Sequence, residues 1–203
     1  AHALGLSVTV GMWLGHERHG FDYSDPKQVR EQKERARKTV LRYKDHPAVL
    51  LWGIGNEMEG FGAGDDPAIW KAVNEIAVMV KRLDPNHPTM TVTAELGGER
   101  VKGVQELCPA IDIHGINSYG GALSISERLR AGGATKPYIL TEFGPPGTWE
   151  VGKTEWGSPI EATSTAKARN YADGYRKAVA EQKGLCLGSY AFLWGHKQET
   201  TAT

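Results

Sequence analysis

The most constraining feature of this sequence is a regular alternation between short apolar runs and longer segments of helical periodicity. Such alternation is typical of βα units wound around a parallel sheet. The apolar runs are continuous rather than alternately polar and apolar, as expected for strands that are covered on both faces. The sequence therefore predicts six strands, at residues 6–14, 48–55, 89–94, 111–116, 138–143 and 186–194.

Two of the segments between these runs carry strong helix signals. Pro26 follows the candidate N-caps Ser24 and Asp25, and apolar residues then share one face as far as residue 43. Asp66 repeats this start signal, and apolar residues recur at spacings of three and four until residue 83. Further helices are expected over 99–107, after a candidate capping box at 124–127, and over 164–182.

Charge and hydrophobicity exclude two classes of partner. Lys and Arg (24) balance Asp and Glu (24), and no long basic run is present, so the positive surface that binds phosphate backbones is missing. No run reaches the roughly 18 consecutive apolar residues of a membrane helix. We therefore expect neither a nucleic acid nor a membrane as partner. The length of 203 residues predicts a single domain over residues 1–203.

Chemically informative side chains follow three of the runs, where the predicted strands end. Glu57 ends the second run, Glu142 lies in the end of the fifth, and Asn117, Ser118 and Tyr119 follow the fourth. Parallel α/β folds bind ligands at the carboxyl ends of their strands, so we expect these groups to share one face. Either glutamate alone is more often a helix cap or a salt-bridge partner. Together, two carboxylates can act as general acid and nucleophile, the chemistry of retaining glycoside hydrolysis.

Four segments resemble the clan A glycoside hydrolases, and within that clan the (β/α)8 TIM-barrel catalytic domain of the family 2-like β-glycosidases. The matching segments are HPAVLLWGIGNE (46–57), DIHGINSY (112–119), PYILTEFG (137–144) and GSYAFLW (188–194). The resemblance implies an α/β fold truncated to about six βα units, barrel strands three to eight. Strands one and two would then lie outside this sequence, as would the arginine that the clan usually places after strand two.

The resemblance also implies roles for five residues. Glu57, after the fourth barrel strand, would be the acid/base, and Glu142, at the end of the seventh, the nucleophile. Asn56 would bind the 2-hydroxyl of the attacked sugar, Tyr119 would orient Glu142, and Trp194 would form the floor beneath that sugar. The residue types suit these roles, because amides and phenols donate hydrogen bonds and indoles present an apolar face.

Other candidates for substrate binding lie on the same expected face. Trp13 and His16 follow the first run in a loop rich in aromatic residues and histidine, and Asn117 ends the fourth run. Sugars stack on aromatic rings and hydrogen-bond to imidazoles and amides, so we include all three as substrate-binding residues. In the loop after Glu142, two further indoles are candidates for the wall of a saccharide groove, Trp149 and Trp156.

These observations predict a retaining glycoside hydrolase acting on a β-linked oligo- or polysaccharide through a glycosyl-enzyme, with no cofactor and no metal. A transglycosylase on the same site and a catalytically inactive carbohydrate-binding barrel remain alternatives. A metal-dependent hydrolase is disfavoured, because HERH (16–19) spaces its histidines three apart rather than four. The sequence leaves the oligomeric state open, and of the compartments it favours the periplasm or secretion over the cytoplasm.

Overall fold

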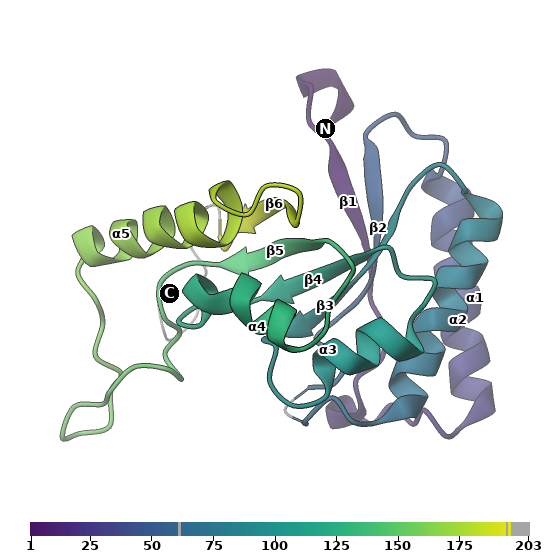
Figure 1. Ribbon diagram of the computed structural model, residues 1–203. Helices are drawn as coiled ribbons and strands as arrows, with labels where there is room; N and C mark the ends of the chain where they lie inside the picture. The colour runs from purple at the N-terminus through teal and green to yellow at the C-terminus, as the bar shows by residue number, and fades with distance from the viewer. Residues whose placement is uncertain (61, 194, 196–203) are drawn as a thin grey trace.

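The protein forms one six-stranded parallel sheet in which spatial order follows chain order, β1-β2-β3-β4-β5-β6 (Figure 1). The computed structural model describes residues 1–60, 62–193 and 195. Each predicted apolar run contains a strand, so the α/β prediction with six parallel strands is confirmed, and the strands form a half-barrel. The strands are β1 Val8–Met12, β2 Val49–Asn56, β3 Thr89–Ala94, β4 Ile113–Asn117, β5 Tyr138–Phe143 and β6 Cys186–Ala191.

Helical segments separate the strands, as the periodicity predicted. The α-helices are α1 Pro26–Tyr43, α2 Pro67–Leu83, α3 Arg100–Lys102, α4 Ile125–Ala131 and α5 Ser164–Tyr175. The π-helical segments η3 Gly103–Leu107 and η5 Arg176–Ala180 continue α3 and α5. Short 3-10 turns are η1 His2–Leu4, η2 Glu17–His19 and η4 Ala122–Ser124.

The helix starts show which capping predictions hold. The carboxylates of Asp25 and Asp66 accept backbone hydrogen bonds at the starts of α1 and α2, as expected. The capping box at 124–127 is wrong. Ser124 precedes α4, but its hydroxyl bonds the carbonyl of Gly121 and the guanidinium of Arg128 instead of capping the helix.

Two apolar clusters join the helices to the outer side of the sheet. The first packs α1 and α2 against β1 and β2 around Trp52, Trp70 and Val80. The second packs α4 and η5 against β4 and β5 around Ile116 and Leu140. A smaller cluster lies among β2, β3, β4 and β5 themselves: Leu51, Met90, Val92, Ile113 and Ile139. These layers hold the central strands rigid, so side chains at the strand ends have fixed positions.

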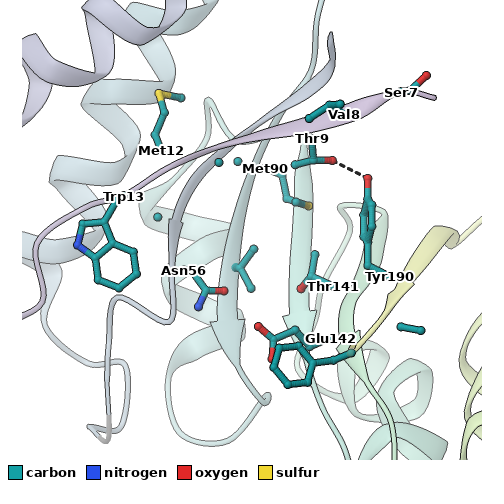
Figure 2. A pocket seen from close by; sticks show the side chains of 16 residues that line it. Ser7, Val8, Thr9, Met12, Trp13, Asn56, Met90, Thr141, Glu142 and Tyr190 are labelled. Atoms are coloured by element: carbon teal, nitrogen blue, oxygen red, sulfur yellow. Dashed lines mark hydrogen bonds between the residues drawn. The ribbon is translucent and has the colours of Figure 1, made fainter. Parts of the chain in front are cut away.

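The two edge strands differ from the prediction of runs covered on both faces. Strands β2 to β5 are largely buried, but β1 and β6 are half-exposed, because in the described chain each has a neighbouring strand on one side only. A 2.5 Å hydrogen bond between the hydroxyls of Thr9 and Tyr190 connects these edge strands (Figure 2). Within the described residues, no helix has the length and apolar character that crossing a membrane requires.

Candidate active site

The strand register brings the three predicted strand ends together. Asn117 of β4 lies opposite Glu142 of β5, and the backbone N–H of Ser118 donates to the carbonyl of Glu142 at 2.9 Å. On the other side, the N–H of Glu57 donates to the carbonyl of Val92 in β3 at 2.9 Å. Backbone hydrogen bonds thus attach Glu57 to β3 and Glu142 to the end of β4, at the same edge of the sheet.

Asn117 connects the surroundings of the two carboxylates. Its amide Nδ2 donates to Oε1 of Glu57 at 2.9 Å and to Oδ1 of Asn56 at 3.1 Å. Its Oδ1 accepts from the hydroxyl of Thr141, the residue before Glu142, at 2.7 Å. The Asn117 side chain is buried, and these three partners leave its amide with one orientation.

The backbone around Glu57 adopts an unusual conformation. Glu57 has φ of 52° and Gly55 has φ of 72°, both in the left-handed region that glycine favours. A Cβ at residue 55 would lie 2.6 Å from the Met58 side chain, so the approach of the chain there requires glycine. This tight bend turns the Glu57 carboxylate toward Asn117.

Tyr119 holds the second carboxylate. Its phenol donates to Oε2 of Glu142 at 2.6 Å, the length expected of a bond to an ionised acceptor. Burial, then the hydrogen bond to Glu142 and the negative charge of that residue, raise the pKa of Tyr119 far above its ordinary value. The phenol therefore keeps its proton and donates to Glu142 at neutral pH. The predicted contact between Tyr119 and Glu142 is present in the structure.

An open pocket of about 660 Å³ runs along the sheet, from Ser7 and Val8 at the start of β1 to the carboxyl ends of β2 and β5. Asn56, Thr141 and Glu142 line it from the strand ends, and Trp13 lines it from the segment after β1 (Figure 2). Its volume is within the range of small-molecule sites. The structure therefore gathers Asn56, Trp13 and Glu142 around one space, next to Glu57, Asn117 and Tyr119.

His16 lies behind Trp13 rather than on the pocket surface. The imidazole is buried and stacks on Trp13 at 5.1 Å and on His19 at 5.7 Å, whereas the Trp13 indole is 69 % exposed. Burial, and then the charge of Arg18, lower the pKa of His16, which keeps the ring neutral at pH 7. Trp13 is thus the member of the pair that faces the pocket. No group of three or more metal-binding side chains occurs among the described residues.

Glu95 is a third glutamate at a strand end, and it was not among the predicted site residues. Glu95 follows β3 and, with φ of 65°, shares the left-handed backbone of Glu57. Its carboxylate accepts from the Ser118 hydroxyl and pairs with Arg128 at 2.6 Å, and its N–H donates to the Asn117 carbonyl at 2.9 Å. Glu95 therefore holds the segment that carries Asn117 and Tyr119. The rule that identified Glu57 and Glu142, an acid after an apolar run, identifies Glu95 as well.

A buried ion pair fixes the loop that follows Glu57. Glu59 accepts from Arg100 at 2.8 Å and from the N–H of Ala94 at 2.7 Å, and its side chain is only 1 % exposed. Arg100 also donates to the carbonyls of Gly62 and Gly97. The pair joins the loop after β2 to the loop after β3. Trp194, the predicted floor of the sugar site, lies outside the described residues.

A parallel sheet with helices packed on one side and with carboxylate, amide and phenol groups at the carboxyl ends of its strands defines an α/β-barrel domain with a site at that edge. The chain belongs to the glycosyl hydrolases family 2, TIM barrel domain, whose family model matches residues 5–157. The predicted family is therefore confirmed, and three of the four resembling segments lie within the matched residues.

Solved structures with a similar fold agree with this assignment. They include the β-D-glucuronidase of Dictyoglomus thermophilum (18 % identity, TM-score 0.65, covering 87 % of this chain and 31 % of that one). The Ruminococcus gnavus β-glucuronidase (18 %, 0.63, 89 % and 31 %) and an Eisenbergiella tayi GH2 β-galacturonidase (18 %, 0.59, 82 % and 29 %) are also similar. At these identities the similarity concerns the fold. This chain spans about three tenths of the length of each of these structures.

Proposed function

We propose that residues 1–203 form the catalytic part of a retaining glycoside hydrolase that acts on a β-linked oligo- or polysaccharide. The observation that carries this proposal is the pair of hydrogen bonds from one segment to two acids: Asn117 to Glu57 at 2.9 Å and Tyr119 to Glu142 at 2.6 Å. A binding module needs no such pair of oriented carboxylates. In the full-length protein, the six strands would be strands three to eight of a (β/α)8 barrel.

The proposed reaction divides the work between the two acids. Glu57, as general acid, protonates the glycosidic oxygen while Glu142 attacks the anomeric carbon, which forms a glycosyl-enzyme and releases the leaving group. Glu57, now a carboxylate, takes a proton from water, and the resulting hydroxyl displaces Glu142 from the anomeric carbon. The bond from Tyr119 favours the ionised, nucleophilic form of Glu142. No cofactor or metal enters either step.

The other candidates take supporting roles in this proposal. Asn56 binds a sugar hydroxyl beside Glu57, and Trp13 offers an exposed indole in the pocket. Asn117, expected from the sequence to bind substrate, takes part by holding Asn56 and Glu57 in place through its amide. His16, expected from the sequence to contact substrate, is buried here and supports the site instead by stacking on Trp13 and keeping that indole in place. Trp194 remains a proposed floor for the reacting sugar.

The stereochemistry of the product and the effect of the leaving group test the proposal. Proton NMR of early turnover should show the β-anomer forming first, as double displacement requires. Glu57→Ala should slow alkyl glycosides far more than 4-nitrophenyl glycosides, because an activated leaving group needs little protonation. Glu155→Ala, which changes an exposed glutamate, serves as the control.

Two results would contradict this proposal. Inversion at the anomeric carbon would exclude Glu142 as nucleophile, and equal losses on both substrates would exclude Glu57 as the acid. Transfer of the glycosyl group to added sugar, in preference to water, would instead identify a transglycosylase. Sugar binding without turnover would identify an inactive barrel.

A further inference from the structure

The loop after β5 carries two exposed indoles, and they differ in their ring contacts. Trp149 is 68 % exposed and Trp156 is 78 % exposed. Trp149 packs edge-on against Tyr119, with ring centroids 5.5 Å apart and planes at 86°. Within the described chain, Trp156 makes no comparable ring contact. A single phenol ring therefore separates the Trp149 indole from the Glu142 carboxylate that the phenol bonds.

Gly147 fixes the position of the Trp149 indole. A Cβ at Gly147 would lie 2.4 Å from the six-membered part of the indole, so the ring rests directly against the backbone there. Gly147 is buried, whereas most of the Trp149 surface remains open to solvent. The indole thus has backbone on one side and solvent on the other.

Glu150 fixes the loop itself. Its carboxylate accepts from the N–H of Gly147 at 2.7 Å and from the N–H of Gly120 at 3.1 Å. Gly120 directly follows Tyr119, so Glu150 connects the loop to the segment that orients the nucleophile. An exposed aromatic ring held in this way binds a ligand without the entropic cost of ordering a free side chain.

We propose that Trp149 is a stacking platform for a second sugar ring, next to the ring that Glu142 attacks. This inference rests on the function proposed above and specifies its substrate as an oligosaccharide rather than a monosaccharide joined to a small group. The Tyr119 ring packs on the Trp149 indole and bonds Glu142 through its hydroxyl, so a sugar on the open face of the indole lies beside the reacting sugar and is not the reacting sugar itself. The apolar C–H face of a pyranose matches the open face of the indole.

Substrate pairs test this platform in the full-length protein. The substrates are the methyl β-monoglycoside and the β-linked disaccharide of the same sugar, chosen as the sugar whose β-glycosides the unaltered protein hydrolyses fastest. Trp149→Ala should lower kcat/KM for the disaccharide about tenfold, which corresponds to roughly 60 Å² of apolar surface left uncovered. The monoglycoside should change less than twofold. Trp149→Phe should restore most of the loss, and Tyr175→Ala, at an exposed aromatic position of α5, should change neither substrate.

A second variant tests the platform without removing the indole. Gly147→Ala places a methyl group where the Trp149 ring lies, so the ring must move. As in Trp149→Ala, kcat/KM should fall for the disaccharide more than for the monoglycoside. A 4-nitrophenyl glycoside of the disaccharide moves the second ring to the side away from the leaving group. Comparison with the plain disaccharide therefore shows on which side of the reacting sugar Trp149 acts.

Equal losses on monoglycoside and disaccharide, or no loss on either, would overturn the inference. Failure of the proposed function looks different, since neither substrate would be hydrolysed by the unaltered protein. In that case calorimetric titration with cellotriose, mannotriose and xylotriose still tests the platform. Binding that Trp149→Ala weakens and Tyr175→Ala leaves unchanged would support it. Binding of none of the three sugars, or equal binding by all proteins, would refute it.

Discussion

Replacing Tyr119 by Phe removes one hydrogen bond and little else. The ring and its edge-on contacts with Trp149 and Phe192 remain, but the 2.6 Å donor to Glu142 is lost. A hydrogen bond to a charged group contributes roughly 1.5–3 kcal/mol, and half-burial of Tyr119 places the value near the lower end. We expect kcat/KM on a 4-nitrophenyl glycoside to fall at least about tenfold.

The pH profile gives a second, independent readout of the same change. The acid limb of kcat/KM reports ionisation of the nucleophile in the free enzyme. Loss of a donor disfavours the charged carboxylate, so the limb should move to higher pH by about one unit, since one unit corresponds to about 1.36 kcal/mol. Tyr175→Phe, at an exposed position, should change neither quantity. An unmoved acid limb with activity within twofold would refute the role of Tyr119.

Three further changes probe the surroundings of the site. Arg100→Ala should destabilise the fold by about 3 kcal/mol at pH 7 in urea titration, because it leaves Glu59 buried without its cation. Burial raises the pKa of Glu59 above its value in the unfolded chain. The protonated carboxyl therefore stabilises the folded state at low pH, and this stabilisation is lost as the pH rises through the pKa of the folded state. The loss in Arg100→Ala should therefore be smaller at pH 5, and equal losses would contradict this reasoning. Glu95→Gln breaks the pair with Arg128 and loosens the segment that holds both acids, so kcat should fall several-fold with little change in KM, and a change in KM alone would count against it. Asn117→Asp replaces the amide that donates to Glu57 at 2.9 Å by a carboxylate that cannot donate, so kcat/KM on alkyl glycosides should fall at least about tenfold, and activity within twofold would contradict the assignment.

The sequence predicted the sheet well for a physical reason. A strand between two others, covered by helices, needs a continuous apolar run, and this pattern identified β2, β3 and β5 almost to the residue. The runs at 6–14 and 186–194 were longer than the strands Val8–Met12 and Cys186–Ala191. Around β1, the buried Leu14 and the exposed Leu6 and Trp13 all lie outside the strand, so apolar composition alone does not mark where a strand ends.

The site was predictable to the level of strand ends and no further. The positions of Glu57 and Glu142 follow from the rule that parallel strands present their carboxyl ends together. The three-way bonding of the Asn117 amide depends on register across β2, β4 and β5, which no local pattern encodes. The orientation of Trp149 depends on the absence of a Cβ at Gly147, a contact that sequence spacing does not reveal.

Covalent trapping tests the central claim most directly. The full-length protein would be incubated with activated 2-deoxy-2-fluoro β-glycosides, each carrying a different sugar. Intact-mass spectrometry and peptide mapping would then locate any adduct. We predict one sugar on Glu142, and none in Glu142→Gln. An adduct on another residue, or none from any sugar in a folded protein that hydrolyses β-glycosides, would contradict the assignment of Glu142 as the nucleophile.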